Sequence, residues 1–195
     1  MKENIPLYTL HSAWKGHENF AIWLVDQLNP KTIVELGVDY GFSTFAFAMP
    51  EKGHVFGIDK FGPTQIDTYG DSTTFPHVIR FMSKYNFTNV SIIQGFFSEI
   101  AQWWELPIDI LHIDGTHTYN DMTEDWQDWS KFLSEHGVIL MHDVVSYDEC
   151  KLFYNEIQIP KAYFKHSHGL GIATRSNETL NLILKHNPGC VPGNI

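Results

Sequence analysis

Five short apolar runs recur along the chain, each rich in branched side chains and most followed by a polar or glycine cluster. They cover residues 32–36, 55–58, 90–93, 108–113 and 138–141. Near-continuous apolar runs of this length are typical of strands buried on both faces of a parallel sheet. We expect these runs to form the centre of such a sheet.

Between the apolar runs, hydrophobic residues recur at the three- and four-residue spacing of a helix. The intervals with this spacing are 20–28, 42–49, 75–85 and 119–133. Alternation of strands with helices predicts right-handed βαβ units, with helices on both faces of one sheet. The fold class we expect is therefore α/β, doubly wound and mostly parallel.

The last part of the chain departs from this alternation. Residues 162–165 and 170–174 have the pattern of two strands joined by the turn His166-Ser167-His168-Gly169, which predicts an antiparallel C-terminal hairpin at the sheet edge. Residues 180–184 fit either a last strand or a docking helix. With the hairpin we expect seven strands in one domain that covers residues 1–195, since this length suits a single core.

Composition narrows the classes of partner. Apolar residues make up 43% of the chain and charged residues 18%, a globular composition, and the net charge is −10. This charge repels phosphate backbones, so we expect no nucleic acid partner. No apolar stretch has the length of a membrane span, and we expect no membrane partner. Two cysteines and no apolar leader favour a reduced, cytoplasmic setting, and we allow for a homo-oligomer.

Candidate chemistry gathers where the first two strands end. Gly37 and Gly41 allow a tight turn, and Ser43 lies in the first turn of the next helix, where free N–H groups bind anions. Glu35 would repel a pyrophosphate and attract an ammonium group, while Asp59 can accept ribose hydroxyls. The pair predicts a nucleoside with a cationic, amino-acid-like tail, which describes S-adenosylmethionine (SAM). The alternative is that both acids only cap loops.

The next strand ends add a base pocket and a cluster of titratable groups. After the third strand, Gly95 and Phe96 could border an adenine, although Phe96 alone is more often a core residue. The ends of the fourth and fifth strands are neighbours and carry two carboxylates and two imidazoles, namely Asp114, His117, His142 and Asp143. Such a set can bind a divalent cation, with a histidine as general base.

A long irregular segment, Lys60 to Thr74, follows the second strand. Long loops in compact domains are usually lids or binding loops. We expect this loop to cover the acceptor, or else to be a surface excursion.

Together these motifs resemble a known family. Residues 34–41 with Asp59 look like the cofactor site of class I SAM-dependent methyltransferases. The stretches 109–119, 137–143 and 166–171 are similar to the type 24 family of small-molecule and sugar O-methyltransferases. The resemblance runs from about residue 14 to residue 175 and implies a Rossmann-like methyltransferase fold.

The resemblance also implies roles for individual residues. Residues Glu35, Gly37, Gly41 and Ser43 would surround the methionine part of SAM, Asp59 its ribose, Gly95 and Phe96 its adenine, and Asp114 would also contact the cofactor. Related macrolide-sugar enzymes carry Asp-x-x-His after the fourth strand, where Asp binds magnesium and His is the base. Asp114 and His117 match that pattern. His142 stands where those enzymes have an acidic ligand, so the metal set Asp114, His142 and Asp143 implies a softer metal than magnesium, or none.

The resulting hypothesis is methylation of a hydroxyl on a sugar, a glycan precursor or another small polar acceptor. SAM would be the cofactor, with a divalent cation as an optional second one. The catalytic residues would be His117, as general base, with Asp114 and His142. The alternatives are a metal-dependent hydrolase, a nicotinamide-binding oxidoreductase and a non-catalytic nucleotide-binding module. The sequence lacks the Gly-x-Gly-x-x-Gly motif of nicotinamide-binding oxidoreductases, which counts against the second.

Overall fold

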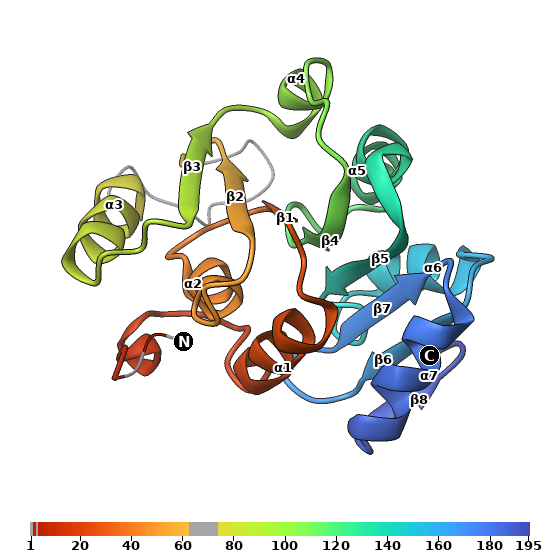
Figure 1. The fold of residues 1–195 in the computed structure, drawn as a ribbon. Coiled ribbons are helices and arrows are strands. Elements are labelled where there is room, and N and C mark those ends of the chain that lie inside the picture. Colours follow the sequence, from red (N-terminus) through yellow and green to blue (C-terminus); the bar gives the residue numbers. More distant parts are fainter. Residues whose placement is uncertain (1, 3, 63–73) are drawn as a thin grey trace.

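The computed structural model describes residues 2, 4–62 and 74–195 of the chain. Eight strands form one sheet in the order β3-β2-β1-β4-β5-β7-β6-β8 (Figure 1). Their bounds are β1 Thr32–Leu36, β2 His54–Asp59, β3 Val90–Gln94, β4 Ile108–Ile113, β5 Leu133–His142, β6 Lys161–Phe164, β7 Leu170–Thr174 and β8 Cys190–Pro192. The first five strands pair in parallel and the last three add antiparallel pairs.

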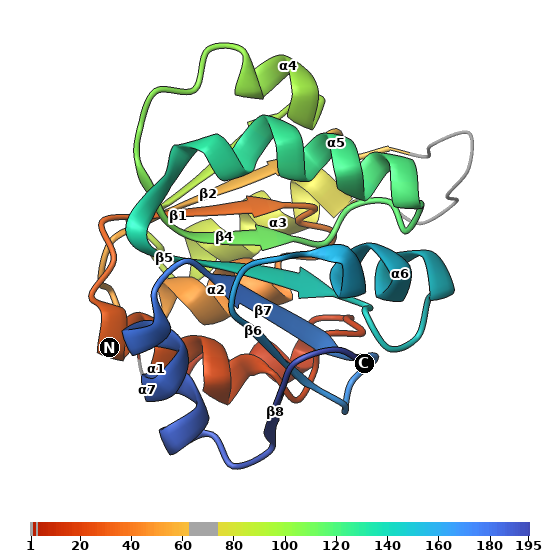
Figure 2. The ribbon, with the colours of Figure 1, turned by 90° about the vertical axis from the view of Figure 1, so that its right-hand side faces the viewer.

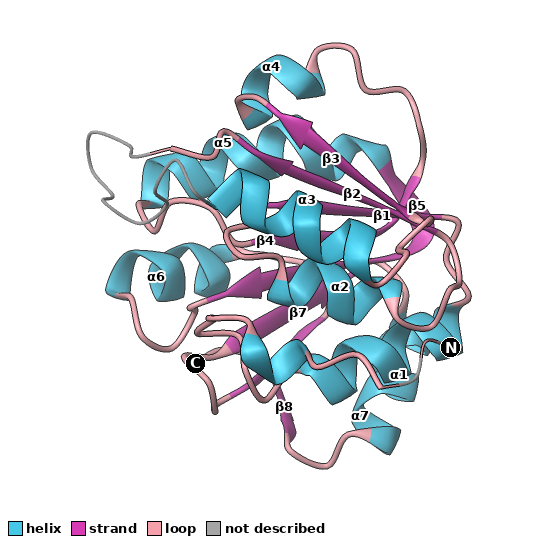
Figure 3. Ribbon diagram, turned by 90° about the vertical axis from the view of Figure 1, so that its left-hand side faces the viewer, coloured by secondary structure: helices cyan, strands magenta, loops and turns pink. Residues whose placement is uncertain are grey.

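Helices cover both faces of the sheet, as the alternating pattern predicts. One face packs against α1 (Glu18–Leu28), α2 (Phe42–Ala48), α3 (Thr74–Lys84) and α7 (Asn177–His186). The other face packs against α4 (Phe97–Ala101), α5 (Tyr119–Trp129) and α6 (Asp148–Glu156). Figures 2 and 3 show the two layers on either side of the twisted strands. Short 3₁₀ turns at Leu7–Thr9 and Ser130–Phe132 complete the elements.

The strands of the central sheet are buried because each faces a helix layer on both sides. In β1, Ile33 belongs to the core under α1 and α2, whereas Val34 and Leu36 belong to the core under α4–α6. All five residues of β1 are buried, and so are all five of β7. Because successive side chains face opposite helix layers, the position of a polar residue in a strand decides which layer it contacts.

Two details differ from the sequence-based expectation. The sheet has eight strands instead of seven, because Cys190–Pro192 pairs with β6 at the edge. Residues 180–184 lie inside α7, so this segment is a docking helix. The described part of the chain contains no helix long and apolar enough to cross a bilayer. Most of the Lys60–Thr74 loop lies outside the described residues.

The strand order also places the candidate site. β1 pairs with β2 on one side and with β4 on the other, so the chain reverses its direction of winding between β1 and β4. Open parallel sheets form a crevice at such a point, at the carboxyl ends of the strands. The residues that follow β1, β2, β3, β4 and β5 are therefore brought to one edge.

Candidate active site

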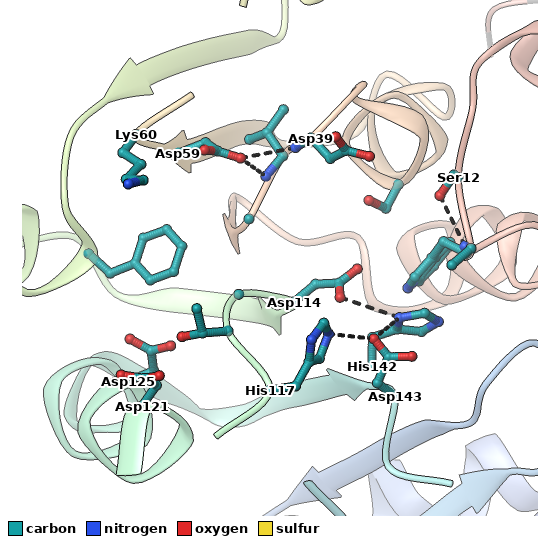
Figure 4. Close-up of a pocket in the computed structure, with 18 of the residues that line it drawn as sticks. Ser12, Asp39, Asp59, Lys60, Asp114, His117, Asp121, Asp125, His142 and Asp143 are labelled. Atoms are coloured by element: carbon teal, nitrogen blue, oxygen red, sulfur yellow. Dashed lines mark hydrogen bonds and ion pairs between the residues drawn. The ribbon is translucent and has the colours of Figure 1, made fainter. Parts of the chain in front are cut away.

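A cavity of about 700 Å³ opens at this edge of the sheet (Figure 4). Its walls come from the turns after β1 and β3, the ends of β2 and β5, the β4–α5 loop, the first turns of α5 and the N-terminal segment 11–14. Of the residues proposed from sequence, those that line it are Gly37, Ser43, Asp59, Gly95, Phe96, Asp114, His117, His142 and Asp143. Glu35 and Gly41 lie behind the wall.

The turn after β1 needs its glycines. Gly37 has φ +96°, and a Cβ there would collide with the carbonyl oxygen of Asp114 in the β4–α5 loop. Gly41 has φ +82° and caps the N-terminus of α2. Both φ values are strained for residues with a side chain. The turn thus brings the ends of β1 and β4 into contact and leaves the N–H groups of α2 near the cavity.

Asp59 holds this turn from the end of β2. Its Oδ2 accepts hydrogen bonds from the backbone N–H groups of Val38 at 2.9 Å and Asp39 at 3.0 Å, and its Oδ1 accepts from Phe61 N–H at 2.7 Å. The carboxylate also lines the cavity. Asp59 is therefore both a loop cap and a candidate ligand for hydroxyl groups, so the two alternative roles coexist.

Asp39 is a cavity residue that the sequence analysis missed. It lies in the glycine turn with φ +47° and lines the cavity. Burial raises the pKa of its carboxyl to about 6, and the nearby charges of Asp59 and Asp114 act in the same direction. An acidic residue between two required glycines was the signal that could have identified it.

Glu35 belongs to a buried network. Its Oε2 accepts a hydrogen bond from the Thr44 hydroxyl, and its Oε1 lies 2.9 Å from Nδ1 of His112. The Trp14 indole N–H donates to Nε2 of His112 at 3.1 Å, so His112 carries its proton on Nδ1 and donates it to Glu35. Glu35 is fully buried and does not line the cavity. It is linked to the cavity wall by the hydrogen bonds that join Glu35 to His112 and His112 to Trp14, and Trp14 is a lining residue.

The turn after β3 forms the far wall. The Gly95 N–H donates to the Asp59 carbonyl oxygen at 3.0 Å, which joins the ends of β2 and β3. The ring of Phe96 is 57% exposed, with the Lys60 ammonium 5.9 Å from its centroid. An exposed aromatic ring on a cavity wall can stack on a bound base, whereas a ring packed in the core cannot.

Four titratable groups meet at the ends of β4 and β5. Nε2 of His117 lies 2.7 Å from Oδ2 of Asp143, and the His117 ring stacks on Tyr147 at 4.2 Å. Nδ1 of His142 lies 3.3 Å from Asp114 Oδ1 and 3.2 Å from Asp143 Oδ2. The structure thus brings together the four residues that the sequence placed on neighbouring strand ends (Figure 4).

The contacts of His142 define its charge. Its Nε2 faces the carbonyl oxygen of Ser167 at 3.0 Å, while Nδ1 faces two carboxylates, so both ring nitrogens must donate. Burial lowers the pKa of His142, but Asp114 and Asp143 outweigh it and raise the pKa to about 10. Burial opposes ionisation of Asp143, yet His117 and His142 hold its pKa below the ordinary range. His142 is therefore an imidazolium between two carboxylates.

This arrangement bears on the metal hypothesis. Ligand atoms of Asp114, His117 and Asp143 lie within 4.8 Å of one another and could hold an ion. His142 offers such an ion no lone pair, because both of its nitrogens are donors. Its single positive charge already offsets part of the negative charge of Asp114 and Asp143, which an ion would need. The hydrogen bonds thus oppose the expected ligand role of His142.

The C-terminal hairpin fixes this imidazolium. Ser167, His168 and Gly169 all have positive φ, which turns the Ser167 carbonyl oxygen toward the site. That oxygen also lies 3.3 Å from Nε2 of the buried His17, and the Ser167 hydroxyl donates to the Lys15 carbonyl oxygen at 2.6 Å. The His-rich turn found in the sequence therefore ties the N-terminal segment to the site.

Acidic residues of α5 line the opposite end of the cavity. Asp121, Glu124 and Asp125 are spaced three and four residues apart and share one helix face. Asp125 is only 8% exposed. Burial raises the pKa of its carboxyl to about 7, with the charges of Asp121, Asp128 and Glu124 adding to the effect. These three residues were not predicted as site residues, although their helical spacing is visible in the sequence.

Comparison with known sequences places the chain in a family. A family described as a methyltransferase domain matches residues 34–144, from within β1 to just past β5. A curated protein of Sinorhizobium fredii, y4gI, is 30% identical over 185 residues, which cover 87% of this chain and 20% of that protein. The chain thus spans about a fifth of the length of this relative.

Solved structures share the fold. The O-methyltransferase TomG of Streptomyces achromogenes, involved in tomaymycin synthesis and solved with SAM, superposes with a TM-score of 0.67 at 14% identity, covering 89% of this chain and 90% of that one. The Bacillus cereus O-methyltransferase in complex with SAH gives 0.64 at 16% identity, covering 88% and 84%. The SAH-bound methyltransferase PaMTH1 of Podospora anserina gives 0.65 at 14% identity, covering 83% and 78%.

The family match covers more than half of the chain and includes the five strand ends around the cavity. The structural matches share the doubly wound sheet with its antiparallel C-terminal strands. Both findings confirm the methyltransferase resemblance and the Rossmann-like fold expected from the sequence motifs. The chain belongs to the methyltransferase-domain family.

Proposed function

We propose that the cavity binds SAM and that the domain transfers a methyl group to a hydroxyl oxygen of a small polar acceptor such as a sugar. The observation that carries this proposal is the His117–Asp143 pair, which faces a glycine turn and an acidic strand end across one cavity. These groups supply a proton acceptor on one side and a nucleoside site on the other. The sugar remains the acceptor class that the family resemblance favours.

The residues around the turn fit the proposed cofactor. Asp59 retains about one acceptor position, on Oδ1, for a ribose hydroxyl, because its two carboxylate oxygens together accept about four hydrogen bonds and three backbone N–H groups already occupy the others. The carboxylates of Asp39 and Asp114 favour a ligand with positive charge. Glu35 acts indirectly, by fixing Trp14 through His112. When bound, SAM supplies a methyl group attached to a sulfonium. After transfer of the methyl group, the sulfur is a neutral sulfide that keeps the electron pair of the broken S–C bond.

His117 is the proposed general base. With its Nε2 proton donated to Asp143, the ring is held in one orientation and one tautomer, and Nδ1 is the nitrogen that accepts a proton. The acceptor hydroxyl would lose its proton to Nδ1 as its oxygen bonds to the methyl carbon. Asp143 then stabilises the imidazolium that forms. A positioned base of this kind contributes about 10²–10⁴-fold to a rate.

His142 would supply the positive charge of this centre. Its imidazolium lies within 3.3 Å of Asp114 and Asp143 and offsets their mutual repulsion. We therefore propose methyl transfer without a required divalent ion. The group Asp114, His117 and Asp143 is the observation that keeps the metal-dependent hydrolase as the second candidate.

The test combines binding and turnover. Calorimetric titration should show SAM binding to the wild-type protein, and a panel of sugars should include an acceptor that yields S-adenosylhomocysteine. With that acceptor, His117→Ala should lower turnover about 100-fold or more and change SAM affinity by less than about twofold. His136→Ala, at an exposed histidine outside the cavity, is the matched control.

Two results would contradict the proposal. Unchanged turnover in His117→Ala would remove this residue as the base. Turnover of the panel without SAM, and only after a metal is added, would favour the hydrolase instead.

A further inference from the structure

The turn between β6 and β7 presents the ring of His168 to the cavity. His168 is exposed and lines the cavity, and its ring centroid lies 6.2 Å from that of His142. Its backbone carbonyl oxygen accepts hydrogen bonds from the N–H groups of Val145 at 3.1 Å and Ser146 at 3.2 Å. Because these bonds tie the turn to the segment between β5 and α6, the position of His168 is fixed.

The shape of the turn does not require a histidine at this position. His168 has φ +66° and follows Ser167 at φ +48°, a conformation that is uncommon for residues with a side chain. Glycine or asparagine would adopt it as readily. A Cβ on Gly169 would lie 2.5 Å from Cγ2 of Val145, so the backbone of the turn already packs closely on its neighbour. The imidazole therefore contributes something other than the course of the chain.

The fold uses one nitrogen of the His168 ring. Nδ1 lies 3.0 Å from the Ser146 hydroxyl, whereas Nε2 has no hydrogen-bond partner among the described residues. If the Ser146 hydroxyl donates to Nδ1, then Nε2 carries the proton and is a donor; in the other tautomer Nε2 is an acceptor. A hydroxyl group both donates and accepts, so it can pair with Nε2 in either tautomer. Nε2 thus suits a ligand that bears hydroxyl groups.

The order of the strands assigns this end of the cavity to the acceptor. The proposed cofactor residues follow β1, β2 and β3, the proposed base His117 follows β4, and β5 and β7 come next in the sheet. His142 at the end of β5 pairs with the first residue of β7, so His168 lies beside the carboxyl end of β5. Figure 4 shows His142 on the far side of Asp114 from Asp59. A cofactor bound at Asp59 therefore leaves the space beside His168 to the acceptor.

We propose that His168 binds a second hydroxyl group of the acceptor, other than the one that His117 deprotonates. This inference rests on the proposed function and narrows its acceptor class to polyols such as sugars, instead of compounds with a single hydroxyl group. Asp143 holds one imidazole and Ser146 holds the other, so two fixed nitrogens decide which hydroxyl reaches the methyl group. His168 is a specificity-determining residue and takes no part in the proton transfer.

The test combines two variants with two forms of one acceptor. The probes are the methyl glycosides of glucose, galactose, mannose and rhamnose, followed by the monodeoxy derivatives of the one that is methylated best. His168→Asn keeps an amide near the position of Nδ1 and suits the positive φ, but it has no group at the position of Nε2. His166→Asn is the matched control, because His166 is exposed on the same turn and does not line the cavity. The rate of S-adenosylhomocysteine formation at varied glycoside concentration gives kcat/KM.

In the wild type, removal of the hydroxyl that His168 binds should lower kcat/KM about tenfold, the worth of one hydrogen bond. His168→Asn should lower kcat/KM for the parent glycoside by the same factor, and keep kcat/KM for this monodeoxy derivative within about twofold of wild type. The KM for SAM should change by less than about twofold. A structural role alone would lower kcat/KM for the parent and all its derivatives equally. His166→Asn should behave as the wild type.

Three outcomes overturn the inference alone. They are wild-type kcat/KM of His168→Asn for the parent glycoside, an equal loss for the parent and every monodeoxy derivative, and a loss of the same size in His166→Asn. A wild type that methylates none of the glycosides overturns the proposed acceptor class together with this inference, so the two failures are distinguishable.

Discussion

The charge on His142 predicts how stability depends on pH. Its pKa is raised from 6.5 to about 10 in the folded protein, whereas the unfolded chain has the ordinary value. The folded protein thus keeps a proton that the unfolded chain loses. The stabilisation is fully present below pH 6.5 and is lost as the pH rises toward 10. His142→Gln removes this dependence and leaves Asp114 and Asp143 without the charge between them.

The magnitude follows from linkage. One proton bound by the folded protein and not by the unfolded chain gives a slope of about 1.4 kcal/mol per pH unit. Between about pH 7 and pH 8.5 the free energy of unfolding should therefore fall by roughly 2 kcal/mol because of His142. This value requires only that His142 keep its proton to about pH 8.5.

The assay is urea unfolding followed by tryptophan fluorescence, since Trp14 is buried against the His142 and His112 rings. Wild type and His142→Gln are compared over the same pH range. Asp39 and Asp125 titrate in both proteins, so the difference between the two slopes isolates His142. Nitrogen NMR of the wild type at pH 8.5 gives a second readout, with protons expected on both ring nitrogens. Equal slopes in the two proteins, or a single ring proton, would refute the reasoning.

Three further outcomes are expected. Asp59→Ala should weaken SAM binding by about 1.5–3 kcal/mol in a calorimetric titration. It should also lower the melting temperature, because the N–H groups of Val38 and Asp39 lose their acceptor. Unchanged affinity would remove Asp59 from the cofactor site. Addition of a strong chelator should leave methyl transfer unchanged, and its loss, with recovery on adding a divalent ion, would restore the metal hypothesis. His112→Leu should destabilise the fold by roughly 3–5 kcal/mol in urea unfolding, because Glu35 loses a buried partner, and a smaller effect than about 1 kcal/mol would show that the network is weak.

The sequence predicts the centre of the fold because burial on two faces leaves a direct pattern. Strands between helix layers contain near-continuous apolar runs, so β1, β2, β3, β4 and β5 are recognisable. The same topology brings their carboxyl ends together, which is why the sequence predicts that Asp114, His117, His142 and Asp143 form one cluster. The three-residue β8 has no such pattern, because edge pairing with β6 alone defines it.

The position of Glu35 shows where sequence reasoning fails. Successive side chains of a strand face opposite helix layers, and Glu35 shares its face with Ile33, toward α1 and α2. There it meets His112, its register partner on β4, instead of the cavity. Whether a strand residue faces the cavity depends on how the strand is paired in register with its neighbours. A single sequence does not show this register.

Asp39 and Asp125 were missed for a different reason. Their roles depend on backbone geometry and helix rotation, namely a positive φ in the turn after β1 and the face that α5 turns to the cavity. The charge of His142 likewise depends on the Ser167 carbonyl oxygen, which three residues of positive φ aim at the ring. None of these features has a periodic signature along the chain.

A crystal structure of the protein with S-adenosylhomocysteine tests the account most directly. It should place a ribose hydroxyl at Asp59, the adenine beside Gly95 and Phe96, and the sulfur toward His117. A cavity that stays empty at saturating product concentration, or a product bound away from these strand ends, would contradict the account.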